Sequence, residues 1–165
     1  EPDVVLSGPY AGWRIFSHER AKAFALVESL SDDQRAKAIL ADEVPPGIFE
    51  GPGAAGVLRK MEGIPASELR EDQRALLWNL IDEYLNNAPH DVAEAQRAKV
   101  VSDGHDKLYF AWMGPLDESD NIYFRVHGRS ILIEYDNVFA GPADRSKYSN
   151  HIHTCLLYTS DAADE

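Results

Sequence analysis

The sequence predicts an α+β domain, with a helical N-terminal half followed by an antiparallel β-meander. Apolar residues recur at helical spacing before Gly104 and alternate with a period of two after it. Turn-forming residues divide the second half into short segments. A chain of 165 residues is also long enough to bury the core of one domain.

Two helices are expected first. Residues 17–30 carry apolar side chains at helical spacing. Ser31 followed by Gln34 has the pattern of a capping box, which marks the start of a helix. The second, shorter helix is therefore expected to begin after Ser31 and to include Leu40.

Two further helices are expected after a loop rich in Pro and Gly at residues 42–65. A loop of this length is usually functional or mobile. Residues 71–87 form the strongest helical pattern, with one continuous apolar stripe. Pro89 suits the first turn of a helix that extends to about Ser102.

The second half predicts strands at residues 108–113, 122–127 and 131–137, where apolar and polar side chains alternate. Short turns containing Gly separate these segments, so antiparallel pairing between neighbours is the simplest arrangement. Residues 150–154 are expected to begin a fourth strand.

Charge and composition argue against several classes of function. The formal net charge is −12 and basic residues alternate with acidic ones, so neither nucleic acid nor an anionic membrane is an expected partner. The sequence contains no apolar stretch long enough for membrane insertion. Residues 51–56 match G-x-G-x-x-G, but no strand is expected before them, so we interpret them as a loop.

The last residues, 155–165, resemble a translated transposase sequencing adapter, and we expect them to be an artefactual tail. Residues 1–154 are then expected to form a single, incomplete α+β domain. Without the tail, three acidic residues are lost and the net charge becomes −9. Cys155, the single Cys of the chain, is lost as well, so no Cys chemistry is expected.

His151 and His153 give the strongest chemical signal. Side chains two residues apart on a strand lie on the same face, where two imidazoles can bind one metal ion. A zinc site takes three or four protein ligands, so this pair needs further ligands.

Residues on the second and third strands can supply those ligands. Alternation places Arg125 and His127 on one face of the second strand, and Glu134 and Asp136 on one face of the third. If these faces coincide, His and carboxylate ligands suited to zinc, iron, copper or manganese come together. The other interpretation is a solvated face with an Arg–Glu pair across the strands.

Four aromatic residues leave a different function open. Tyr109, Trp112, Tyr123 and Tyr135 lie on the predicted strands and can form a stacking platform for a sugar or another ring. Aromatic residues on strands are also typical of a buried core.

The ordered motifs in residues 73–77, 109–114, 123–128, 132–137 and 150–154 resemble the C-terminal half of the proteins grouped as domain of unknown function 3500. In that family an upstream Gly-His-His motif and a downstream Trp-Arg-Asp stretch accompany these segments. The resemblance implies that two His-rich motifs meet in the fold, and that the protein is exported to the periplasm or the cell exterior. It implies no particular reaction.

Two functions follow from these observations. The first is a metal-dependent enzyme, hydrolytic or oxidative, that acts on a small molecule or carbohydrate with a divalent transition metal as cofactor. The second is a non-catalytic ligand- or carbohydrate-binding module in which the histidines are structural. For the enzyme, the expected metal ligands are His151, His153, His127 and Asp136, Glu134 is a ligand or general base, and Arg125 is an anion clamp.

Overall fold

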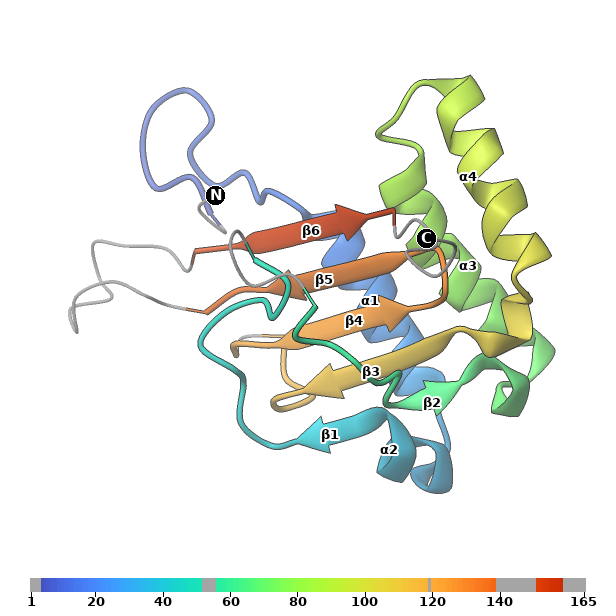
Figure 1. The fold of residues 1–165 in the computed structure, drawn as a ribbon. Helices are drawn as coiled ribbons and strands as arrows, with labels where there is room; N and C mark the ends of the chain where they lie inside the picture. Colours follow the sequence, from blue (N-terminus) through green and yellow to red (C-terminus); the bar gives the residue numbers. More distant parts are fainter. Residues whose placement is uncertain (1–3, 52–55, 119, 139–150, 159–165) are drawn as a thin grey trace.

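Helices come first in the chain and a sheet follows, which confirms the predicted α+β class (Figure 1). The computed structural model describes residues 4–51, 56–118, 120–138 and 151–158. The helical elements described are α1 (Ser17–Ser29), α2 (Asp32–Ala38), η1 (Ala66–Glu68), α3 (Glu71–Leu85), α4 (His90–Ser102) and η2 (His105–Lys107). The strands described are β1 (Ile39–Ala41), β2 (Ile64–Pro65), β3 (Tyr109–Met113), β4 (Tyr123–His127), β5 (Leu132–Asp136) and β6 (His153–Leu157).

The sheet is an antiparallel meander that is extended at one edge. β3, β4, β5 and β6 pair in that order, and every pair is antiparallel, as the sequence predicts. β1 pairs with β3 in the parallel direction, and β2 also pairs with β3, in the antiparallel direction. Neither β1 nor β2 is among the strands predicted from the sequence.

Two element boundaries differ from the prediction. The capping box of Ser31 is present, but α2 ends at Ala38, because Ile39 pairs with Trp112 and begins β1. β6 extends to Leu157 because its register against β5 pairs Leu132 with Leu157. Residue 150, predicted as the first position of this strand, lies outside the described residues.

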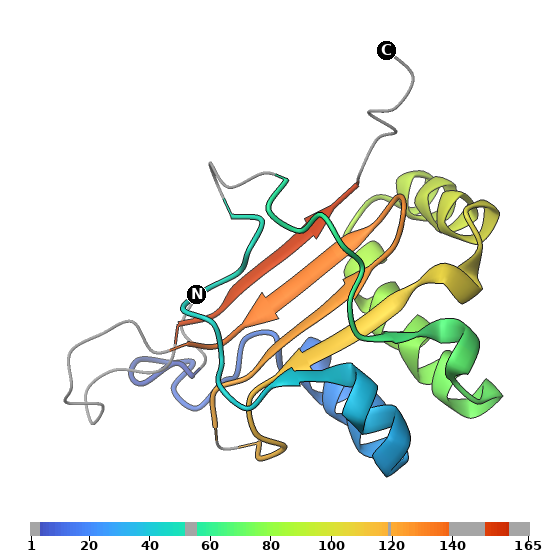
Figure 2. The same ribbon diagram turned by 60° about the horizontal axis from the view of Figure 1, so that its bottom comes forward.

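The core lies between the sheet and the helices α1 and α3, which cover one of its faces (Figures 1 and 2). Phe24 of α1 packs edge-on against Trp112 of β3, with ring centroids 4.9 Å apart. Phe124 and Tyr135 continue this aromatic row across β4 and β5 as a stacked pair, with centroids 4.9 Å apart. The row ties α1 to three successive strands through buried aromatic area.

The opposite face of the sheet is crossed by residues 42–51 and 56–63, which we call the strap (Figures 1 and 2). The strap ends at Gly63, just before β2. Gly63 has φ +109°, and a Cβ atom there would lie 2.1 Å from the carbonyl oxygen of Phe110. Glycine is therefore required where the strap approaches the backbone of β3.

Candidate functional site

The sheet face beneath the strap carries most of the charged residues that the sequence analysis selected. Arg125 lies opposite Glu134, and Tyr123 lies opposite Asp136, in the register of β4 and β5. His153 of β6 lies opposite Asp136 on its other side. Arg125, Glu134 and Asp136 are at most 1% exposed. This face is therefore a buried polar layer, and the interpretation as a solvated face does not hold for it.

His153 and Asp136 form the clearest chemical pair of this layer. The Nδ1 atom of His153 lies 3.2 and 3.3 Å from the two carboxylate oxygens of Asp136. Asp136 is fully buried, whereas 44% of the His153 side chain is exposed. Asp136 also accepts a hydrogen bond from the backbone N–H of Val138, at 3.1 Å. A fixed carboxylate thus orients the imidazole, part of which stays exposed.

His151 stands beside this pair. The rings of His151 and His153 have centroids 4.7 Å apart and planes inclined by 55°. The structure therefore brings together the two histidines that the sequence selected as metal ligands. Within the described ranges, however, no group of three or more His, Cys, Asp and Glu side chains is arranged to hold a metal ion.

His127 does not join the two other histidines. It faces Leu132 across the β4–β5 pair, whereas Asp136 faces Tyr123 at the far end of β4. Four residues of strand separate these ends, or about 13 Å. Burial, and secondarily the charge of Arg125, lower the pKa of the His127 imidazole. Its Nδ1 atom is buried without a hydrogen-bond partner in the part of the chain that the structure describes.

Glu134 holds the strap. Its carboxylate accepts hydrogen bonds from the backbone N–H groups of Phe49, at 2.8 Å, and Glu50, at 2.9 Å. It also accepts one from the Tyr123 hydroxyl at 2.6 Å. Burial and the neighbouring carboxylate raise the pKa of Tyr123, which keeps this hydroxyl protonated as a donor. The carboxylate predicted as a ligand or general base is thus engaged by three donors.

Arg125 also contacts the strap. Its guanidinium donates to the carboxylate of Glu62 at 3.0 Å, although Arg125 is 1% exposed and Glu62 is 55% exposed. The Nε atom of Arg125 is buried without a hydrogen-bond partner in the described residues. The predicted anion clamp is therefore paired with a carboxylate of the chain itself.

Two strap residues that complete these contacts, Glu50 and Glu62, are not among the site residues predicted from the sequence. Glu50 folds back and accepts hydrogen bonds from the backbone N–H groups of Gly56 and Leu58, both at 2.6 Å. Glu62 pairs with Arg125. A single acidic residue in a Gly- and Pro-rich loop does not indicate a specific contact. Glu50 and Glu62 are therefore identified only by the packing of the strap on the sheet.

The aromatic residues proposed as a stacking platform lie on opposite faces of the sheet. Trp112 and Tyr135 are fully buried in the core beneath the helices, and Tyr123 is fully buried beneath the strap. The exposed aromatic pair among the described residues is Tyr10 and Trp13, whose ring centroids are 4.9 Å apart. Trp112, Tyr123 and Tyr135 therefore do not form the exposed aromatic row that the binding-module hypothesis requires.

The fold and the site define a class of α+β protein with helices on one sheet face and a strap over a buried polar layer on the other. Residues 1–161 match the family described as protein of unknown function (DUF3500), and the chain belongs to that family. No curated protein and no solved structure matches the chain. The helices of the described residues include none that is long and apolar enough to cross a membrane.

The match extends through residues 155–161, and the structure pairs Cys155 with Glu134 in β6. Cys155 is half-buried, and burial raises the pKa of its thiol, so it is a poor nucleophile. Residues 159–165 lie outside the described ranges. The assignment of residues 155–165 to an artefactual tail stays a prediction.

Proposed function

We propose that His151 and His153, the second of which is oriented by Asp136, bind a divalent transition metal in the active site of a hydrolytic enzyme. The observation that carries this proposal is the contact of the His153 Nδ1 atom with a fully buried carboxylate, at 3.2 and 3.3 Å. A metal-binding histidine typically donates its second ring N–H to a carboxylate in this manner, which fixes the tautomer and raises the basicity of the ligand.

The neighbouring imidazole supports the same proposal. His151 lies 4.7 Å from His153 between ring centroids, and both side chains are exposed. Asp136 then acts as the group that orients a ligand and is not itself a ligand. Glu134 and Arg125 support the strap. The two imidazoles would hold the metal, and no third His, Cys, Asp or Glu ligand is grouped with them in the described residues, so water or substrate would complete the coordination. A metal held there would supply Lewis acidity and a coordinated water of lowered pKa for hydrolysis of a small-molecule or carbohydrate substrate.

Calorimetric titration with Zn²⁺ and Mn²⁺ tests this proposal. We expect stoichiometric binding by the unaltered chain and no binding by the His151→Ala/His153→Ala variant. We expect Asp136→Asn to weaken metal binding by about 10–100-fold, because the orienting carboxylate is lost. The matched control is His90→Ala/His105→Ala, which removes two exposed histidines from other elements and leaves binding unchanged.

Circular dichroism establishes that each variant is folded. Equal metal binding by the unaltered chain and by the His151→Ala/His153→Ala variant would overturn the proposal. Absence of binding of both Zn²⁺ and Mn²⁺ by the unaltered chain would overturn it as well.

A further inference from the structure

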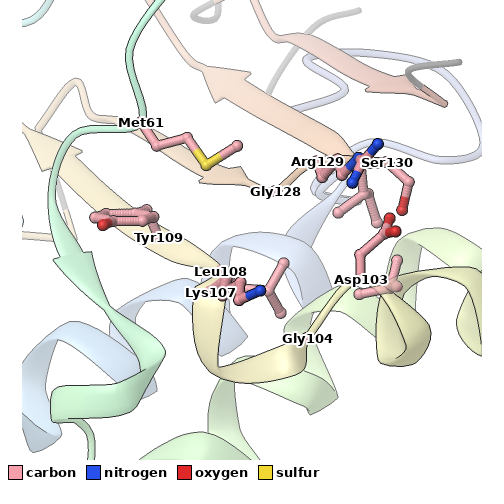
Figure 3. A pocket seen from close by; sticks show the side chains of 11 residues that line it. Met61, Asp103, Gly104, Lys107, Leu108, Tyr109, Gly128, Arg129 and Ser130 are labelled. Atoms are coloured by element: carbon pink, nitrogen blue, oxygen red, sulfur yellow. The ribbon is translucent and has the colours of Figure 1, made fainter. Parts of the chain in front are cut away.

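Figure 3 shows a pocket of about 400 Å³. Its lining residues 128–131 lie just before β5, whereas His153 pairs with Asp136 at the other end of that strand. The pocket is formed where α4 ends, where η2 leads into β3, and where the turn between β4 and β5 returns. Met61 of the strap closes one side. The volume lies within the range of pockets that bind small organic molecules, roughly 300–1,000 Å³.

The walls of the pocket combine an apolar surface with polar groups. Val100, Leu108 and Ile131 are at most 2% exposed and supply an apolar wall, to which Met61 adds a flexible thioether. Figure 3 shows Asp103, Arg129 and Ser130 at one end of the pocket, Met61 and Tyr109 at the other, and Lys107 between them. Arg129 already has an interaction within the chain, so Lys107 is the cation that we assign to a ligand.

Two polar atoms in the wall are buried and unsatisfied. Ser130 is 2% exposed, and its hydroxyl has no hydrogen-bond partner in the described part of the chain. The Oδ2 atom of Asp103 is likewise buried without a partner there. Each such group costs free energy unless a donor reaches it, and both line the same pocket.

The chemistry of these groups specifies a ligand. A carboxylate oxygen accepts hydrogen bonds, and a hydroxyl can accept one too, so a donor with several N–H bonds satisfies Asp103 and Ser130 together. An ammonium group has three such bonds and complements the charge of Asp103. Lys107 adds a cation that complements a carboxylate on the same ligand.

We propose that this pocket binds a small zwitterion with an apolar side chain, of which an apolar α-amino acid is the simplest form. The ammonium group is placed between Asp103 and Ser130, the carboxylate near Lys107, and the side chain against Val100, Leu108 and Ile131. This site is independent of the proposed metal centre, because the two lie at opposite ends of β5.

Protein-observed NMR titration tests this assignment with four matched probes. Leucine carries all three features, 3-methylbutylamine lacks the carboxylate, 4-methylpentanoate lacks the ammonium group, and glycine lacks the apolar side chain. The titrations contain EDTA, so that metal binding has no influence on them. We expect leucine to shift the amide signals of Gly104, Leu108 and Ser130 in a saturable manner, and each incomplete probe to bind at least about tenfold more weakly.

Two pairs of variants locate the contacts. Ser130→Ala and Asp103→Asn are each expected to weaken leucine binding by about tenfold, because each removes one partner of the ammonium group. Ser102→Ala and Asp106→Asn alter exposed neighbours that do not line the pocket, and leucine binding is expected to be unchanged.

Several outcomes would overturn the proposal. One is the absence of saturable shifts with leucine, which would show that the pocket does not bind this ligand. Another is equal binding of 4-methylpentanoate and leucine, which would remove the ammonium group from the recognition. Unchanged leucine binding by both Ser130→Ala and Asp103→Asn would place the contact elsewhere on the chain.

Discussion

At the scale of single residues, Glu134 determines how the strap is held. A carboxylate has two acceptor oxygens and no proton to donate, so it can accept from two backbone N–H groups and a hydroxyl at once. Glutamine has nearly the same shape but replaces one oxygen with a donor. In either amide orientation, one backbone N–H of the strap then faces an NH₂ group.

We therefore expect Glu134→Gln to lower the free energy of unfolding by about 1–3 kcal/mol, the cost of a buried donor left without an acceptor. Urea denaturation followed by fluorescence measures this difference. Glu28→Gln is the control, because the Glu28 side chain is exposed and its substitution is expected to change stability by less than about 0.5 kcal/mol. Equal stability of the two variants would show that the strap does not depend on this carboxylate.

The sequence predicted correctly which sheet face these side chains share, but it did not predict their contacts with the strap. Alternation correctly placed Arg125, Glu134 and Asp136 on one face of the sheet. It could not show that this face is covered, because the strap is held through backbone N–H groups, which every non-proline residue possesses. The pairing of Arg125 with Glu62 spans 63 positions and follows from packing alone.

At the scale of elements, the strap is fixed where it meets β3. Gly63 occupies a left-handed conformation, φ +109°, directly against the backbone of Phe110. Any side chain there combines an unfavourable φ with a clash against backbone atoms, which cannot rotate away. The start of β2 depends on this close approach, because Ile64, which follows Gly63 in the chain, pairs with Phe110.

We expect Gly63→Ala to lower the free energy of unfolding by about 3 kcal/mol or more, from the backbone strain and the clash together. Gly47→Ala is a control in the same strap, because a Cβ atom there meets no atom within 4 Å. That substitution is expected to be neutral or to stabilise by up to about 1 kcal/mol, through the reduced freedom of the unfolded chain. Thermal and urea unfolding of both variants measure the difference, and similar losses in the two would contradict it.

Element prediction was accurate for long, strongly patterned segments and weaker for short ones. α3 was predicted from a continuous apolar stripe and is observed at Glu71–Leu85. β1 was missed because Ile39 and Leu40 continue the apolar spacing of the preceding helix and were assigned to it, whereas their strand conformation comes from pairing with β3. The extent of β6 is likewise set by its pairing with β5, and the residues of β6 alone do not indicate where that pairing ends.

At the scale of the whole molecule, the buried polar layer makes stability depend on pH. The folded protein lowers the pKa of His127, chiefly because burial disfavours the imidazolium form. In the unfolded chain the imidazole returns to its ordinary pKa of 6.5. Below that value the unfolded state binds a proton that the folded state does not, so protonation favours unfolding.

The stability contributed by neutral His127 is therefore expected to be complete above pH 6.5 and to decline as the pH falls from 6.5 toward the lowered pKa of the folded state. Urea denaturation at several values between about pH 5 and pH 7.5 measures this slope. His127→Gln is expected to flatten it, whereas His90→Gln, at an exposed position, is expected to retain it. An unchanged slope in His127→Gln would assign the pH dependence to another group.

The way in which Glu134 holds the strap also bears on how this sequence can vary. Because the carboxylate binds main-chain N–H groups of Phe49 and Glu50, it recognises the path of the backbone and not the identity of the side chains attached to it. Substitutions at strap positions other than Phe49, Glu50, Glu62 and Gly63 can then change its surface while this attachment persists. Such a segment is open to evolutionary diversification, since new outward-facing chemistry can be acquired there without rebuilding the sheet that supports it.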